Sequence, residues 1–155
     1  MNIFILDNDI EKCAQYHCDK HVVKMILESA QLLSTGVRLS GLDEGYKIAH
    51  PNHPCSIWVS ESLSNWKWLR ELATALNKEY RYRFEKNVNH KSYDLIHSLS
   101  SPDLKDLGLT PFAQVMPESY RDKNPVTAYR QYYMGEKSKI FKWTKRTDSL
   151  WIKKV

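Results

Sequence analysis

The chain has 155 residues, of which 42% are hydrophobic and 26% are charged, and its formal net charge is +5. This length and composition indicate one globular domain with a sizeable core, and they exclude wholesale disorder. No apolar run approaches the roughly 20 residues that span a bilayer, and the opening MNIFILDND lacks the basic region of a signal peptide, so we expect a cytoplasmic protein.

The first predicted elements are an extended segment and a short helix. Residues 2–6, NIFIL, are apolar and are expected to form a strand or an extended segment tucked into the core. A first helix is expected at residues 9–18, with a candidate N-cap at Asp7, Asn8 or Asp9.

The second predicted helix, at about residues 19–35, is the most informative segment. Asp19 is its candidate N-cap, and Gly36 or Gly41 is expected to end it. At about 100° per residue, one arc of this helix contains no apolar residue, and we call that arc the charged stripe: Lys20, His21, Lys24, Glu28 and Gln31. The rest of the circumference is filled by Val22, Val23, Met25, Ile26, Leu27, Ala30, Leu32 and Leu33, which predicts a central helix.

The remaining chain predicts further helices and two long loops. A loop at residues 41–53 leads into a helical segment that begins at Asn52 and Pro54, runs to about residue 84 and is interrupted near Ser62 to Ser64. A short helix is expected at residues 90–100, and an ordered loop at 101–124. Asn124 and Pro125 open a last helix that reaches Phe141.

The predicted fold is therefore mainly α: a compact single-domain helical bundle, residues 1–155, around the helix at about 19–35. It has a short extended N-terminal segment and long loops.

The charged stripe has two interpretations. Basic groups beside a carboxylate suit a cleft for a phosphate-bearing substrate, because unpaired charge is costly to bury. Alternatively, Lys24 and Glu28 are i, i+4 neighbours that form a structural salt bridge, and the lysines extend to solvent.

Histidine and cysteine cluster twice, around His17 and His21 and around His53. The spacing matches no standard zinc module, so we assign no metal and treat the cysteines as buried apolar residues. The three cysteines, an odd number, do not suggest a disulfide framework. His53, before Pro54, is either a helix cap or a ligand of a phosphate or base.

The basic charge is concentrated in residues 120–155, which hold ten Lys or Arg and three acidic residues, a net +7. Aromatic residues alternate with these cations, a pattern that suits DNA through base stacking and phosphate contacts. The candidate DNA contacts in this segment are Arg130, Lys142 and Trp143, and Trp151 is a further aromatic residue. A solvated basic surface and an inward-facing aromatic helix explain the same pattern.

Together, AQYHCDKHVVKM, the His-Pro helix start, and the tail with YRQYY and KW resemble the pyrimidine-dimer DNA glycosylases of the phage endonuclease V type. Cellular relatives carry a stretch like DRRLGKQRVE, which DKHVVKMILE matches at Asp19, Lys20, Lys24 and Glu28. The opening MNIF is phage-like. The resemblance spans roughly residues 1–85, with a weaker echo at 125–145.

The resemblance implies that an N-terminal α-amine attacks the sugar C1′ of a damaged nucleotide and forms a Schiff base, with a glutamate assisting and basic residues holding phosphates. Met1 would supply the amine, because bulky Asn2 favours retention of the methionine. The family's glutamate position falls on His21, and Glu28, one turn further on, is the substitute. Lys20 and Lys24 match the phosphate-binding positions.

The leading prediction is thus a monomeric DNA glycosylase and abasic-site lyase, with Met1, His21 and Glu28 as catalytic residues and no cofactor. Predicted DNA contacts are Lys20, Lys24, His17, His53, Arg130, Lys142 and Trp143. The alternatives are a phage enzyme that transfers a group to a DNA base and a non-enzymatic nucleic-acid-binding protein.

Overall fold

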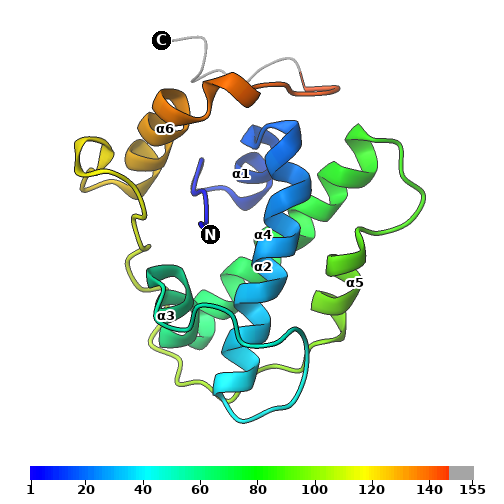
Figure 1. The fold of residues 1–155 in the computed structure, drawn as a ribbon, viewed down its shortest axis with the longest axis vertical. Helices are drawn as coiled ribbons and strands as arrows, with labels where there is room; N and C mark the ends of the chain where they lie inside the picture. The colour runs from blue at the N-terminus through cyan, green and yellow to red at the C-terminus, as the bar shows by residue number, and fades with distance from the viewer. Residues whose placement is uncertain (147–155) are drawn as a thin grey trace.

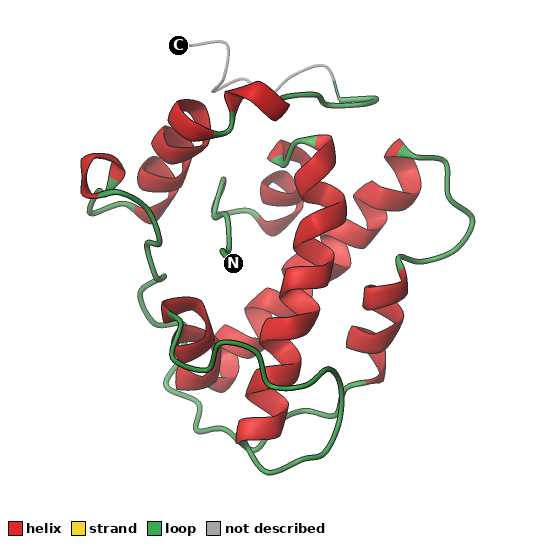
Figure 2. Ribbon diagram, in the orientation of Figure 1, coloured by secondary structure: helices red, strands yellow, loops and turns green. Residues whose placement is uncertain are grey.

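The structure, a computed structural model, describes residues 1–146. Within that range it contains helices and loops but no strand, as Figure 2 shows, so the mainly helical prediction is confirmed. The α-helices are α1 (Ile10–Tyr16), α2 (Asp19–Leu39), α3 (Pro54–Glu61), α4 (Leu63–Arg83), α5 (Lys91–Ser98) and α6 (Pro125–Glu136), and the short 3₁₀ helices are η1 (Glu118–Tyr120) and η2 (Ser138–Ile140).

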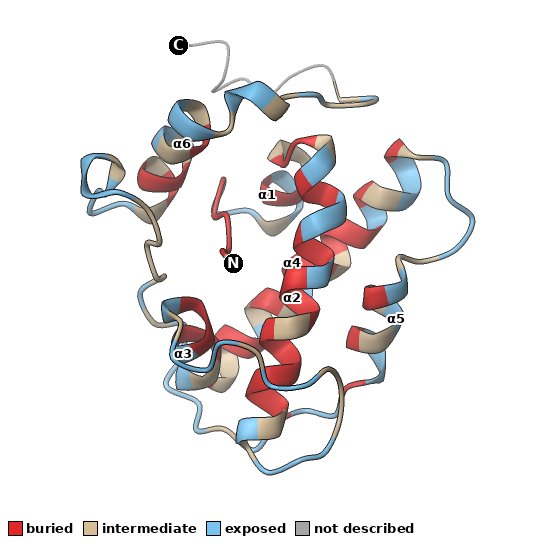
Figure 3. Ribbon diagram, in the orientation of Figure 1, coloured by how far each residue is buried: buried red, intermediate tan, exposed pale blue. Residues whose placement is uncertain are grey.

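Helix α2 is central, as predicted: it packs against α3, α4 and α5 (Figure 1). The N-terminal segment lies between α2 and α6, and its residues Ile3 to Leu6 are buried although they pair with no strand (Figures 1 and 3). In the described residues, no helix has the length and apolarity needed to cross a membrane.

Side-chain caps set several helix starts. Asp9 accepts a hydrogen bond from the Lys12 amide at the start of α1, and Asn124 accepts one from the Val126 amide at the start of α6. At α3 the cap is His53, whose Nδ1 accepts from the Cys55 amide, and not Asn52. The cap predicted at Asp19 is also wrong: the N-cap of α2 is Cys18, because the Asp19 carboxylate instead binds Arg83 and Thr144.

Of the two glycines predicted to end α2, Gly41 is confirmed and Gly36 is not. Helix α2 continues through Gly36 to Leu39, because Gly36 packs against the Trp66 indole, where an added Cβ would lie 3.0 Å from a ring carbon. Gly41 ends it: its φ is 107°, and its amide donates to the Arg38 carbonyl at 3.0 Å. One predicted end is corrected. Helix α6 ends at Glu136 and not at Phe141, because the backbone of Lys137 (φ −112°, ψ 0°) leaves the helix before η2 begins.

The predicted break near Ser62 is confirmed, and it joins the bundle to the long loop. The Ser62 backbone is extended (φ −151°, ψ 141°), so α3 and α4 meet at an angle there. Its hydroxyl donates to the Gly108 carbonyl at 2.7 Å and accepts from the Leu107 amide at 3.0 Å. The loop at 101–117 is thereby held against the helices.

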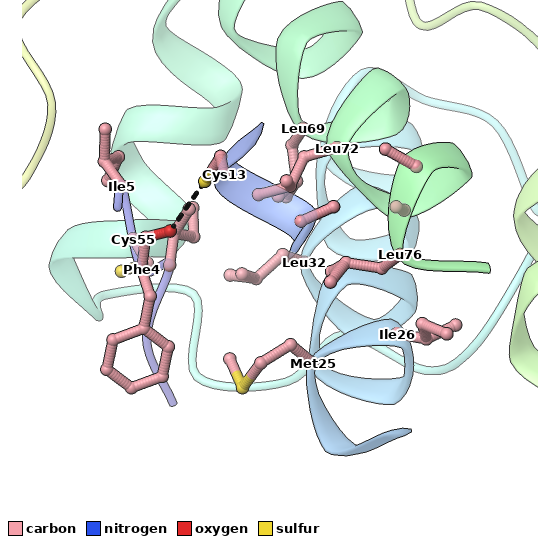
Figure 4. Packing of buried hydrophobic residues seen from close by; sticks show 14 of the residues in the cluster. Phe4, Ile5, Cys13, Met25, Ile26, Leu32, Cys55, Leu69, Leu72 and Leu76 are labelled. Carbon is pink, nitrogen blue, oxygen red and sulfur yellow. Dashed lines mark hydrogen bonds between the residues drawn. The ribbon is translucent and has the colours of Figure 1, made fainter. Parts of the chain in front are cut away.

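The core joins the N-terminal segment to α1, α2 and α4 (Figure 4). The Cys13 thiol donates to the Phe4 carbonyl at 3.2 Å, which fixes the N-terminal segment on α1. All three cysteines are free and buried, and burial raises the pKa of the Cys13 and Cys55 thiols to about 12. They act as small core residues.

The apolar surface of α2 is not wholly buried. Val23 and Leu27, expected in the core, are 38% and 40% exposed. Within the charged stripe, Lys20 and Lys24 are exposed whereas His21 and Glu28 are buried. The buried face of α2 is therefore rotated toward His21 and Glu28, because the N-terminal segment covers that side.

Candidate active site at the N-terminus

The first two backbone nitrogens of the chain converge on one carboxylate oxygen. The α-amine of Met1 lies 3.5 Å from Glu28 Oε1, and the Asn2 amide donates to the same oxygen at 3.2 Å. Glu28 is only 8% exposed, on the buried face of α2. A proton acceptor is therefore held beside the N-terminal amine.

The Asn2 side chain holds this end of the chain in place. Its Nδ2 donates to the Val115 carbonyl at 2.9 Å, and its Oδ1 lies 2.8 Å from the Tyr129 hydroxyl. That hydroxyl also lies 2.7 Å from the Ala113 carbonyl and accepts from the Val115 amide at 3.2 Å. Helix α6 and the long loop thus position the amine from one side, while α2 supplies Glu28 from the other.

A cavity of about 150 Å³ opens at the amine. The N-terminal segment, α2, the long loop and the end of α6 each contribute to its wall, which consists of Met1, Asn2, Phe4, His21, Lys24, Met25, Glu28, Val115, Tyr132 and Lys137. Its size is about half the lower limit of typical small-molecule sites, so it suits one small group such as a single sugar.

Lys24 completes an ionic cluster with Glu28. Its Nζ lies 3.7 Å from Oε2, and its side chain is 66% exposed. The i, i+4 salt bridge considered from the sequence is therefore present, and it occupies the carboxylate oxygen that the N-terminus leaves open. Lys20 is exposed on the same helix but does not line the cavity.

His21 lines the cavity and is held by aromatic residues. Its Nδ1 lies 2.8 Å from the Tyr133 hydroxyl, and its ring stacks on Phe4 at 4.6 Å with an interplanar angle of 13°. Burial, followed by the charges of His17, Lys137 and Lys24, lowers the pKa of His21 to about 3. The imidazole is therefore neutral at neutral pH and adds no charge to the site.

His17 was predicted to contact DNA, but it lies in the core and cannot reach a ligand. It is fully buried, and its Nδ1 lies 2.7 Å from the Cys13 carbonyl. Burial lowers its pKa to about 4. It is a core histidine, enclosed by α1, Phe4 and Tyr133.

His53 has the first of the two roles considered for it. It caps α3, and it does not line the cavity. Burial, and then the positive charge of the N-terminal amine, lower the pKa of its imidazole.

The basic aromatic segment packs onto the bundle more than expected. Arg130 donates to the Leu6 carbonyl and pairs with Asp7, both at 2.8 Å, so its guanidinium fastens α6 to the N-terminal segment. The Trp143 indole donates to the Tyr16 carbonyl at 3.0 Å. The Lys142 side chain is exposed, and its carbonyl accepts from the Asp19 amide.

The end of the described chain is held by ion pairs on α4. Arg146 binds both carboxylate oxygens of Glu79, at 3.0 and 2.6 Å. Trp151 lies outside the described residues. Arg130 and Trp143 were both predicted to contact DNA. In the structure, their side chains bind other parts of the protein.

Six wall residues were not among the predicted site residues, and Asn2, Tyr132 and Lys137 are the polar or charged side chains and the ring that matter most among them. No spacing links these three to α2, because Tyr132 and Lys137 reach the site only through the packing of α6 over the N-terminal segment. The sequence pattern is helical through Lys137, so it gives no sign that α6 ends at Glu136. In residues 1–146, no group of three or more His, Cys, Asp and Glu side chains is arranged to hold a metal ion.

In a comparison with known families, the sequence model of the family described as pyrimidine dimer DNA glycosylase matches residues 1–92, more than half of the 155-residue chain. The matched region includes Met1 and Glu28. No curated protein and no solved structure matches.

Proposed function

Because the chain belongs to the family of pyrimidine dimer DNA glycosylases, we propose that it removes a damaged base from DNA by covalent catalysis from the Met1 α-amine. The observation that carries the proposal is the 3.5 Å separation between that amine and Glu28 Oε1, at the wall of a small cavity. Amine nucleophiles need a neighbouring group that takes their proton, and Glu28 is in that position.

The chemistry begins with deprotonation, because an ammonium group has no lone pair to donate. Glu28 takes the proton, and the amine forms a bond to the sugar C1′. The C1′–N bond to the base breaks, and the base leaves with the bonding electrons and is protonated. Opening of the sugar ring then yields a Schiff base between the sugar and the amine. Loss of the C2′ proton and of the 3′ phosphate cleaves the strand, and water then hydrolyses the Schiff base and releases the amine.

The cavity requires the nucleotide to leave the helix. A space of about 150 Å³ cannot admit a stacked base pair, so the sugar reaches Met1 only when its nucleotide is displaced from the duplex. Neutral His21 stacks on Phe4 at the wall and can exchange a hydrogen bond with the extruded group without repelling a cation.

Borohydride reduction tests the proposal. With duplex DNA that contains one abasic site, the protein should form a covalent adduct, and mass spectrometry should place it on the N-terminal residue. A variant with Gly-Ser added before Met1 is the control: it keeps Glu28 but moves the amine, so it should form no adduct. It also loses the ion pair between the Met1 amine and Glu28, and its circular dichroism spectrum should show that the helical fold is kept. An adduct on a lysine, or equal trapping by both proteins, would defeat the assignment. A requirement for a co-substrate would instead favour base modification.

A further inference from the structure

We propose that Lys137 binds a DNA phosphate at the active cavity, opposite Lys24, so that one extruded nucleotide is held by the phosphates on its two sides. This inference rests on the proposed function. Lys24 comes from α2, and Lys137 comes from the turn after α6, and both line the cavity that contains the Met1 amine. The resemblance from sequence had paired Lys24 with Lys20, which the structure places outside the cavity.

The backbone explains why Lys137 faces the cavity. Helix α6 ends one residue earlier, and the Lys137 amide closes the last turn by donating to the Tyr133 carbonyl at 2.9 Å. Its Nζ lies 5.4 Å from the centre of the Tyr132 ring, another wall residue. The aromatic ring and the carbonyl end of the helix both favour a cation at this place.

Lys137 has no carboxylate within salt-bridge distance in residues 1–146, whereas Lys24 is paired with Glu28. The cavity wall thus carries three cations, the Met1 amine, Lys24 and Lys137, against the single carboxylate of Glu28. Burial lowers the pKa of His21 most, and the positive charges of Lys137 and Lys24 lower it further. A wall with surplus positive charge favours an anionic ligand, and phosphates are the anions that accompany a sugar in DNA.

The dimensions agree with a single nucleotide. A cavity of about 150 Å³ holds roughly five water volumes, close to one sugar, with Met1 and Glu28 at its wall. The phosphates on either side of that sugar must then lie at the rim. Two lysines on different elements, exposed Lys24 and half-buried Lys137, are placed to meet them there.

The test uses abasic duplexes in which a single phosphate beside the abasic site is replaced by an uncharged methylphosphonate. Lys137→Ala should raise Kd for the unmodified duplex about tenfold and lower the salt slope by about one unit. Lys139→Ala, which removes an exposed lysine two residues away, is the matched control and should change Kd much less. Melting temperatures should differ little, since Lys137→Ala loses the contact with the Tyr132 ring but, within residues 1–146, no ion pair.

Position-specific substitution then identifies the phosphate. At one position beside the abasic site, the methylphosphonate should raise Kd for the wild type and for Lys24→Ala. The same methylphosphonate should not raise Kd further for Lys137→Ala. The proposal is overturned if Lys137→Ala responds to every methylphosphonate as the wild type does, or if it binds no worse than Lys139→Ala. Both tests of Lys137 measure binding constants, so their outcome does not depend on adduct formation. Failure of the wild type to form a borohydride adduct would instead reject the proposed function.

Discussion

The hydroxyl group of Tyr129 on α6 lies 2.8 Å from Oδ1 of Asn2, 127 residues earlier in the chain. Tyr129 is fully buried, and burial raises its pKa well above the usual value of 10, so it is a neutral phenol at neutral pH. It can therefore donate a hydrogen bond to the residue that follows the proposed nucleophile. The last helix of the fold thus sets the position of the first residues.

We expect Tyr129→Phe to reduce turnover more than it reduces stability. The loss of one buried hydroxyl should cost about 1–2 kcal/mol of unfolding free energy, and release of Asn2 should lower the rate of adduct formation in single-turnover measurements. Tyr93→Phe is the matched control, because its hydroxyl lies 3.2 Å from the Thr74 hydroxyl, away from the cavity. Equal adduct rates in the two variants would show that Tyr129 has only a structural role.

Glu28→Gln should abolish adduct formation while DNA affinity stays nearly intact. The amide keeps the shape and can still accept from the Asn2 amide, but it is a far weaker base than the carboxylate. Glu11→Gln, which breaks an exposed ion pair with Lys78, controls for the loss of one negative charge. If Glu28 were only the partner of Lys24, both Glu28→Gln and Lys24→Ala would lower the melting temperature, and activity would follow stability.

Stability should fall as the pH drops below about 6.5. Folding lowers the pKa of His17 to about 4 and that of His21 to about 3, from the usual histidine value of 6.5, mainly because both side chains are buried. The unfolded chain therefore binds protons first, so the contribution of the neutral histidines is complete above pH 6.5 and declines toward the folded pKa values. One unit of pKa difference corresponds to about 1.4 kcal/mol.

Urea unfolding between pH 7 and 5, before most carboxylates titrate, measures this dependence. His17→Asn should flatten it, whereas the same change at exposed His97 should leave it unaltered. A free energy of unfolding that stays constant across this range would contradict the burial of neutral histidines.

DNA binding should weaken steeply with salt. Residues 120–155 carry a net +7, and each phosphate contact releases condensed counterions. For two phosphate contacts, Kd should rise about tenfold between roughly 50 and 200 mM salt. Fluorescence anisotropy with a labelled duplex measures it, and an affinity independent of salt would exclude recognition through phosphates.

The sequence was sufficient for local structure. The apolar periodicity around residues 19–35 identified the central helix, and Asp9 and Asn124 marked helix starts, because caps and periodicity depend only on neighbouring residues. The serines near residue 62 marked the break between α3 and α4. Two local predictions failed because a residue distant in the sequence contacts the position. Gly36 packs against Trp66 inside α2 and does not end the helix, and the Asp19 carboxylate binds Arg83 and does not cap it.

The site needed the tertiary structure. The spacing of Lys24 and Glu28 already showed that they share a helix face, and the family resemblance pointed to Met1. That Met1 meets Glu28, that His17 is enclosed and that Lys137 reaches the cavity depend on how α6 packs across the N-terminal segment. Helical periodicity shows which face of a helix is apolar but not which distant segment covers it, so the sequence by itself determined the helices and only the packing determined the active cavity.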